Sequence, residues 1–230
     1  MNTRTFVAAS AVAVVVSLAG VARADFVHVD LSSRINADAR TYTGGLDYPV
    51  GGQTLDFGGV PFALGLRFDD PLSLGAVQTN GVGDAEVHSF PVSIPDALRL
   101  YTLINSGFGS LGAFNGKVEV FGTGGAAASF DLVQGLNIRD HFDNIYQNII
   151  TDDTVVPTLF GRDRLDRQVL QLGPSFVGQT VTELRFTGGP VVSFFDGVAF
   201  LAGATFETIP TPGAAALGCL GLLAAARRRR

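Results

Sequence analysis

The sequence lacks tryptophan, has one cysteine and one lysine, and contains few stretches with helical periodicity. The single cysteine, Cys219, lies close to the C-terminus, which excludes a disulfide in the rest of the chain and the paired-cysteine spacing of zinc sites. Lys117 is the only lysine, so arginine carries almost all of the positive charge. The scarcity of helical periodicity argues against an α-helical class.

Catalytic motifs are also missing. There is no G-x-S-x-G elbow and no H-E-x-x-H, and the three histidines (His28, His88 and His141) are far apart in the sequence. Residues 107–112 match the dinucleotide-binding spacing G-x-G-x-x-G, but a predicted strand follows from Lys117 where that motif needs a helix. We therefore expect a loop between strands at this position and no enzymatic activity.

The N-terminus has the pattern of a secretory signal peptide. Residues 1–24 combine the basic Arg4, an apolar stretch and the small residues Ala22 and Ala24 at the spacing of a cleavage site. We expect cleavage before Asp25, and hence an exported protein.

The C-terminus has a three-part pattern in residues 209–230. A Pro-Thr-Pro break is followed by about 14 apolar residues, which as a helix would span roughly 21 Å, short of the ~30 Å hydrocarbon core. The residues that mark the signal are Pro210, Pro212, Arg227, Arg228, Arg229 and Arg230. This tail resembles the PEP-CTERM class of bacterial sorting signals, with Pro-Thr-Pro in place of the usual Pro-Glu-Pro. The resemblance implies transient membrane retention and processing by an exosortase-like enzyme at the cell envelope, cell surface or extracellular matrix.

Between these signals, residues 25–208 are long enough for one domain with a sizeable core. This part carries ten basic and twenty-one acidic residues, which is a formal charge of −11. Because such a surface repels phosphate backbones, a nucleic-acid partner is not expected. Neutral sugars or Ca²⁺ are compatible with it.

Short alternating runs separated by Gly, Asn, Asp and Pro predict an all-β antiparallel sandwich of nine or ten strands. The expected strands are 26–31, 53–57, 60–66, 86–94, 97–104, 117–121, 127–133, 165–172, 181–187 and 198–206. Gly58-Gly59 predicts a hairpin turn. In 181–187 we expect Leu184 and Phe186 to face inward and Glu183 and Arg185 outward.

The segment 138–149 departs from the alternating pattern, because its apolar residues recur at helical spacing and predict a short helix or a coiled loop. It also holds the densest polar cluster, whose side chains suit sugar hydroxyls and sugar faces. The candidate ligand-binding residues are Asn137, Arg139, Asp140, His141, Asn144 and Tyr146. The alternative is that Arg139 forms an ion pair with Asp140 or a similar residue and fixes a long crossover loop.

Two pairs of acidic residues are candidates for a structural Ca²⁺ site, the only cofactor considered: Asp69 with Asp70, and Asp152 with Asp153. They lack the regular D-x-D-x-D-G spacing, so solvated turns are the alternative. The charged run 162–167 is expected to be a self-paired strand edge on the surface.

Five blocks look like parts of exported bacterial β-sandwich domains: residues 30–33, 42–45, 58–62, 101–105 and 137–141. They are similar to galactose-binding-like jelly rolls, including carbohydrate-binding modules. The resemblance implies a jelly roll that binds extracellular polysaccharide, although the sugar-stacking tryptophan of those modules has no counterpart here. A structural or adhesive envelope component without a small ligand is the second hypothesis, and a glycan-cleaving enzyme with two carboxylates is the third.

Overall fold

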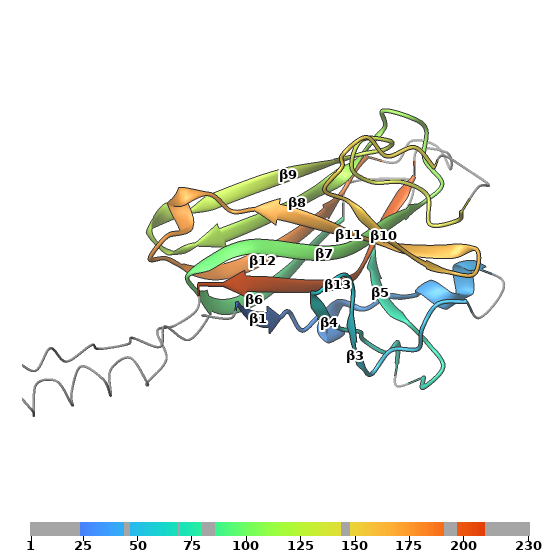
Figure 1. Ribbon diagram of the computed structural model, residues 1–230, viewed down its shortest axis with the longest axis horizontal. Coiled ribbons are helices and arrows are strands. Elements are labelled where there is room, and N and C mark those ends of the chain that lie inside the picture. The colour runs from blue at the N-terminus through green and yellow to red at the C-terminus, as the bar shows by residue number, and fades with distance from the viewer. Residues whose placement is uncertain are drawn as a thin grey trace, which may run out of the picture. The chain divides into compact units, whose positions relative to one another are not determined.

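The alternating segments form two antiparallel sheets and a separate hairpin (Figure 1). The computed structural model describes residues 24–43, 47–68, 70–79, 86–143, 148–190 and 197–209. Within them the helical residues are confined to short 3-10 turns: η1 (Ser32–Arg34), η2 (Ala39–Thr43), η3 (Thr123–Gly125) and η4 (Pro174–Phe176). For the described residues, the prediction of an all-β fold is confirmed.

The larger sheet has seven strands in the order β10-β11-β7-β13-β5-β2, with β1 also paired to β13. These strands are β1 (Asp25–His28), β2 (Ala37–Asp38), β5 (Gly75–Gln78), β7 (Ala97–Gly107), β10 (Val156–Phe160), β11 (Asp163–Gln171) and β13 (Val198–Thr208). On one side β13 pairs with β7 along most of its length. On the other it pairs first with β5 and then with β1.

The smaller sheet has four strands in the order β6-β12-β8-β9. They are β6 (Val87–Pro95), β8 (Phe114–Gly122), β9 (Ala127–Val133) and β12 (Thr180–Gly188). The expected pair around 117–133 is confirmed by the antiparallel ladder of β8 and β9. The hairpin expected around Gly58-Gly59 is confirmed by β3 (Thr54–Asp56) and β4 (Pro61–Ala63), and both glycines have the positive φ that the turn requires.

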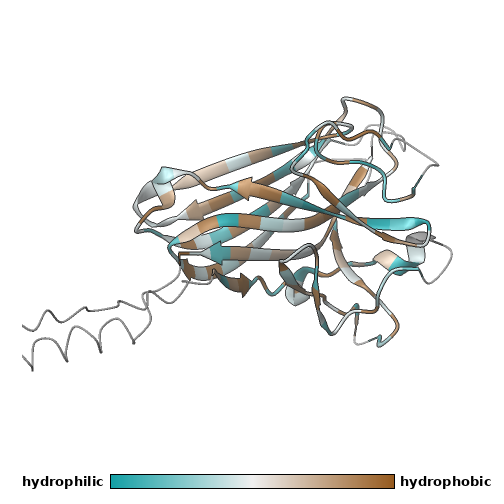
Figure 2. Ribbon diagram, viewed as in Figure 1, coloured by the Kyte–Doolittle hydropathy of each residue, from teal (hydrophilic) through white to brown (hydrophobic). Residues whose placement is uncertain are grey.

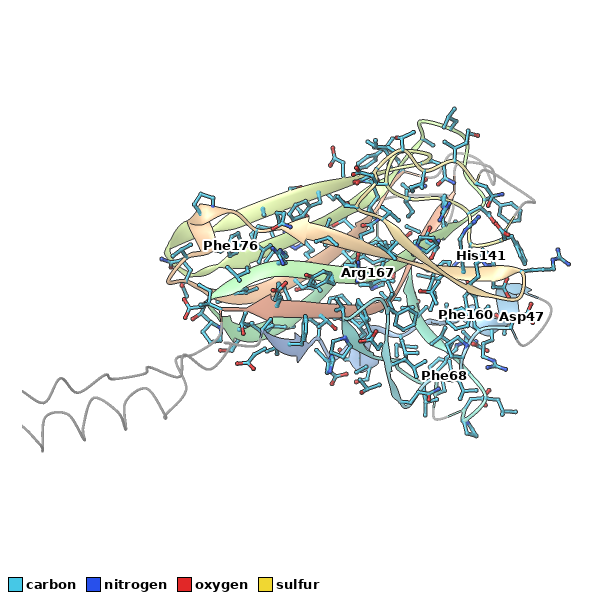
Figure 3. The ribbon with its side chains drawn as sticks, in the orientation of Figure 1. Asp47, Phe68, His141, Phe160, Arg167 and Phe176 are labelled. Carbon is cyan, nitrogen blue, oxygen red and sulfur yellow. The ribbon has the colours of Figure 1, made fainter. Side chains whose placement is uncertain are left out.

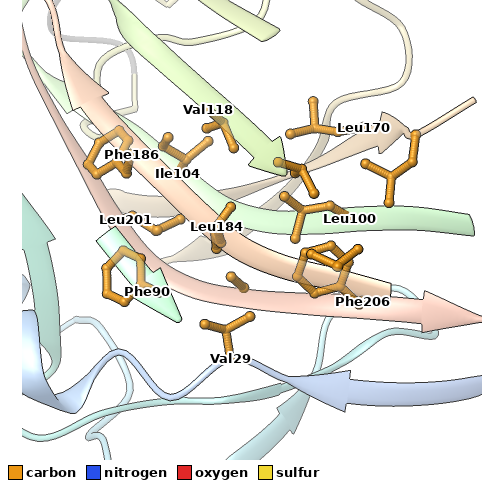
Figure 4. Packing of buried hydrophobic residues seen from close by; sticks show 14 of the residues in the cluster. Val29, Phe90, Leu100, Ile104, Val118, Leu170, Leu184, Phe186, Leu201 and Phe206 are labelled. Carbon is orange, nitrogen blue, oxygen red and sulfur yellow. The ribbon is translucent and has the colours of Figure 1, made fainter. Parts of the chain in front are cut away.

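The main hydrophobic core lies between the two sheets. Phe90, Leu184 and Phe186 of the smaller sheet pack in one cluster with residues of the larger sheet such as Leu100 and Phe206 (Figure 4). As expected from the alternation, Leu184 and Phe186 are buried while Glu183 and Arg185 point away from this core.

A second core covers the opposite face of the larger sheet. Tyr48, Phe57 and Phe62, from the N-terminal third of the chain, pack against Leu103 and Phe200 of that sheet. Strands β7 and β13 are therefore buried on both faces, and Figure 2 shows how apolar and polar residues are distributed along the strands. This explains why residues 198–206 are nearly continuously apolar, without strict alternation.

Several sequence predictions are corrected. Of the two alternatives for 138–149, a short helix or a coiled loop, the described residues agree with the loop: they contain no helix, and Ile138, Asp140 and Phe142 form isolated bridges. Strands β2, β5 and β10 lie outside the ten predicted strands. Among the described residues, no helix has both the length and the apolar character to cross a membrane.

The charged run 162–167 was wrongly expected to be a self-paired surface edge. It forms the start of β11, and Asp163, Arg164 and Asp166 are almost fully buried. Strand β11 lies between β10 and β7, so it is not an edge strand. Its charged side chains form hydrogen bonds with residues that are distant in the sequence.

Candidate functional site

The predicted ligand-binding cluster lies at the end of the molecule where β10 and β11 are joined, near the labelled residues His141, Phe160 and Asp47 (Figure 3). Arg139 forms a two-pronged ion pair with Asp166 of β11. Its Nε lies 2.7 Å from Oδ2 and its Nη2 lies 3.0 Å from Oδ1. The exposed fractions of the two side chains are 11% and 1%. The ion pair therefore holds the crossover segment onto β11, as in the alternative interpretation, with Asp166 as the partner instead of Asp140.

Asp140 is fully buried and accepts hydrogen bonds from backbone groups on both sides. Its Oδ2 accepts from the Phe108 N–H at 2.5 Å, and its Oδ1 accepts from the Phe142 N–H at 2.8 Å. The backbone oxygen of Asp140 accepts two bonds from the guanidinium of Arg164. Burial raises the pKa of Asp140, although the two N–H donors oppose this shift.

His141 is also buried, beside Tyr48 and Phe142. Its Nδ1 lies 3.2 Å from the Tyr48 hydroxyl, and its ring centroid lies 4.2 Å from that of Phe142. Burial lowers the pKa of His141 from 6.5 to about 4, and the charge of Arg164 adds to this effect. The imidazole is therefore neutral at physiological pH.

Asp163 lies 3.8 Å from the His141 ring nitrogen, and both of its carboxylate oxygens are buried without a hydrogen-bond partner in the described chain. Burial raises the pKa of Asp163 to about 6, and the nearby negative charge of Asp47 contributes. The pKa shifts of Asp163 and His141 thus each favour the neutral form of the side chain.

Asn137 has a local structural role. Its side-chain N–H donates to the backbone oxygen of Asp131 at 2.7 Å, and its Oδ1 accepts from the Val133 N–H at 2.9 Å. Asn144 and Tyr146 lie outside the described residues. The structure thus brings together Arg139, Asp140 and His141, and their ligand-binding role stays a prediction.

The described calcium candidates, Asp70, Asp152 and Asp153, do not form a metal-binding group. Asp70 and Asp152 each accept a backbone N–H two residues further on, which is the bonding of a solvated turn. Asp153 is exposed, and Asp69 lies outside the described residues. Within the described ranges, no group of three or more His, Cys, Asp or Glu side chains is arranged to hold a metal ion.

A second polar surface lies on the smaller sheet, on the side that faces away from the main core. We call it the outer face, and it consists of Ser89, Lys117, Glu119, Phe121, Glu183 and Arg185. The register places Glu183 beside Phe121 and Arg185 beside Glu119. Because alternate residues of a strand point to opposite sides, the same alternation that buries Leu184 presents these side chains to solvent.

Arg185 is the centre of the outer face. Its Nε and Nη2 lie 3.0 and 2.9 Å from Oε1 of Glu183, and its guanidinium carbon lies 4.5 Å from the ring centroid of Phe121. Ser89 donates to the same Glu183 oxygen at 2.7 Å. The hydrogen bond from Ser89, together with Arg185, lowers the pKa of Glu183. Glu183 is therefore charged at neutral pH, and three neighbouring strands fix the arrangement.

The outer face presents chemical groups that suit a ligand with both hydroxyl groups and an apolar surface. Carboxylates and guanidinium groups bind hydroxyls strongly, and an aromatic ring such as Phe121 offers a flat contact area. The exposed fractions of Arg185 and Glu183 are 35% and 25%, so both remain reachable from solvent. The alternation around 181–187 predicted that these two side chains point outward. The cross-strand contact with Phe121 has no local signal in the sequence.

A comparison with protein-family models and a comparison with curated proteins each found no match to this chain. The resemblances of the tail and of the central domain stay predictions. The sorting residues Pro210, Pro212 and 227–230 lie outside the described residues, as does Ala22. Ala24 is the first described residue and precedes β1.

Proposed function

We propose that this protein is exported and associated with the cell surface or matrix, where it binds extracellular polysaccharide without catalysing a reaction. The observation that carries the proposal is the outer face. There Arg185 is fixed by Glu183 and stacked on Phe121, while remaining open to solvent. The leader-like residues 1–24 and the sorting-like residues 209–230 support export and processing by an exosortase-like enzyme.

The proposal includes the finer assignment of the fold as a galactose-binding-like jelly-roll sandwich. It is supported by the order of eight strands, β5-β13-β7-β11 in one sheet and β6-β12-β8-β9 in the other. Apart from β8 and β9, consecutive strands of this set belong to different sheets, as the two Greek keys of a jelly roll require. Fold alone does not establish a ligand, so the functional argument depends on the outer face.

A neutral polysaccharide fits the charges best. The formal charge of residues 25–208 is −11, which repels anionic polymers and nucleic acid. On the outer face itself, Lys117 is paired with Glu119 at 2.8 Å and Arg185 is paired with Glu183. Positive and negative side chains are therefore balanced on the outer face. An uncharged ligand can form hydrogen bonds there, because no unpaired charge of the protein has to be neutralised.

The test is a pull-down of the full-length protein with extracellular polysaccharide and with neutral glycans on beads. Arg185→Ala and Phe121→Ala are expected to lose binding. Arg99→Ala is the matched control, because Arg99 is also a partly exposed arginine paired to a glutamate, Glu207 at 2.9 Å, but it lies on the larger sheet. If the wild type binds no glycan, or if all three variants bind equally, the proposal is wrong.

The alternative is a structural or adhesive envelope component that has no small ligand and is held by protein contacts. The unpaired edge of β9 favours it. This alternative predicts assemblies that do not respond to sugars, and the same pull-down distinguishes it.

A further inference from the structure

The sheet edges of this molecule differ in how well they are protected against pairing with another chain. The smaller sheet ends at β6, which contains Pro91 and Pro95. One edge of the larger sheet is β10, which contains Pro157, and its other edge strands, β1 and β2, have only four and two residues. Proline has no N–H to donate, so it interrupts pairing on an edge strand. Strand β9 has seven residues without proline, lysine or arginine, and its only charged residue is Asp131. Among the long edges of the described structure it is the one without proline, and only its C-terminal end is covered, by the Asn137 side chain.

The direction of the backbone groups along β9 follows from its own hydrogen bonds. The Asn137 side chain bonds the Asp131 oxygen and the Val133 N–H, so these groups point away from β8. Because the direction alternates along a strand, the N–H and C=O groups of Ala127 and Ser129 also point to the open edge. In the described part of the chain, no hydrogen bond reaches these groups of Ala127 and Ser129.

We propose that two copies of this chain pair antiparallel along β9, about a two-fold axis at Ser129. In this register Ser129 faces Ser129 of the second copy, and Ala127 faces its Asp131. The open N–H and C=O groups of the two Ser129 residues meet each other. The open Ala127 N–H meets the Asp131 backbone oxygen, which can accept a second hydrogen bond beside the one from Asn137. A contact between two Asp131 side chains is avoided. Antiparallel pairing of one surface with itself is the isologous arrangement that closes a dimer.

The side chains that face the core favour the same register. Ala128 and Phe130 contact the main core but remain partly exposed, because the smaller sheet ends at β9. With the axis at Ser129, each Phe130 faces Ala128 of the second copy, so a large side chain meets a small one. Covering Phe130 removes apolar surface from water, which stabilises the dimer. The paired sheets run β6-β12-β8-β9-β9-β8-β12-β6, and the two outer faces become continuous.

The proposed register can be tested by disulfide formation between two copies of the chain. Opposite residues in a hydrogen-bonded antiparallel pair have Cα atoms about 5.5 Å apart, within the roughly 4.4–6.8 Å range of disulfides. The full-length chain with Cys219→Ser is the background, because it removes the only cysteine. In it, Ser129→Cys is expected to form a covalent dimer under mild oxidation at least about tenfold faster than Ser93→Cys. Ser93 is an exposed serine on the opposite edge strand, β6. Equal rates, or no covalent dimer, would overturn the proposal.

A second measurement does not depend on cysteine. Ser129→Pro removes an N–H that points away from β8, so the subunit keeps its own ladder but loses the contact, whereas Ser129→Ala keeps that N–H. By analytical ultracentrifugation, the wild type and Ser129→Ala are expected to be dimers and Ser129→Pro a monomer. Circular dichroism checks that each variant is folded. A monomeric wild type, or a folded Ser129→Pro that is still dimeric, contradicts the proposal. A monomeric Ser129→Pro that still binds polysaccharide separates this interface from the proposed function.

Discussion

Two regions of this protein use the same residue types in opposite ways. One region, which we call the crossover network, consists of the buried residues Arg139, Asp140, His141, Asp163, Arg164 and Asp166. In it, Arg139 and Asp166 form an ion pair whose side chains have exposed fractions of 11% and 1%. On the outer face, Arg185 and Glu183 form an ion pair whose exposed fractions are 35% and 25%. Removing one partner of the buried pair leaves an uncompensated buried charge, and this pair has few free atoms for a ligand. The exposed pair contributes little to stability, and we propose that it binds a ligand. Burial, and not residue type, separates the two roles.

The largest effect is expected when one partner of the buried pair is removed. Asp166→Ala leaves the Arg139 guanidinium charged, buried and without its carboxylate, which should lower the free energy of unfolding by about 3–5 kcal/mol. Urea denaturation measures it. Glu183→Ala is the matched control on the outer face, with an expected loss of about 1 kcal/mol or less. Equal losses in the two variants would contradict the comparison.

The next effect is a pH dependence inside the crossover network. The pKa of His141 falls from 6.5 to about 4 on folding, so its stabilising contribution is complete above pH 6.5 and is lost as the pH falls toward 4. The pKa of Asp163 rises from 3.8 to about 6, so its contribution is complete below pH 3.8 and is lost as the pH rises through 6. Between pH 4 and 6 the two slopes oppose each other in the wild type.

Single variants should therefore show opposite slopes. Asp163→Asn is expected to become more stable, relative to wild type, as the pH rises from 4 to 6. His141→Gln is expected to become less stable over the same range, with slopes of up to about 1.4 kcal/mol per pH unit. Urea denaturation at pH 4, 5 and 6 measures both slopes. Two variants whose slopes match that of the wild type would show that these groups do not titrate differently on folding.

A smaller effect is expected at the end of β9. Asn137→Ala removes one acceptor and one donor that satisfy the Val133 N–H and the Asp131 oxygen, which should cost about 1–2 kcal/mol of stability. Asn137→Asp keeps the acceptor for the Val133 N–H and should recover part of the loss. Thermal unfolding followed by circular dichroism compares the two variants. If Asn137→Ala is as stable as the wild type, the side chain does not hold this edge.

The smallest effect on stability is expected from salt. The Arg185–Glu183 pair is exposed, and in 1 M salt the Debye length falls to about 3 Å, so its contribution should vanish. The buried Arg139–Asp166 pair should keep its contribution. Double-mutant cycles for the two pairs, in 0.1 M and 1 M NaCl, measure the difference. A salt-sensitive buried pair would contradict the account.

The sequence predicted features that depend on near neighbours. Alternation placed Leu184 inward and Arg185 outward, and Gly58-Gly59 marked the hairpin of β3 and β4. The sequence-based predictions failed where two contacting residues are distant in the sequence. Asp166 lies 27 residues after Arg139 and Tyr48 lies 93 residues before His141, so no local pattern identifies either contact. The charged run 162–167 was wrongly placed on the surface, because composition does not reveal that neighbouring strands bury it.

The most direct test of the account measures two quantities on Arg185→Ala: binding to extracellular polysaccharide and the free energy of unfolding. We expect binding to be lost while the free energy of unfolding changes by about 1 kcal/mol or less, because the exposed pair contacts the ligand and contributes little to stability. Binding equal to that of the wild type, with the Arg99→Ala control also unchanged, would contradict the assignment of the outer face as the binding surface.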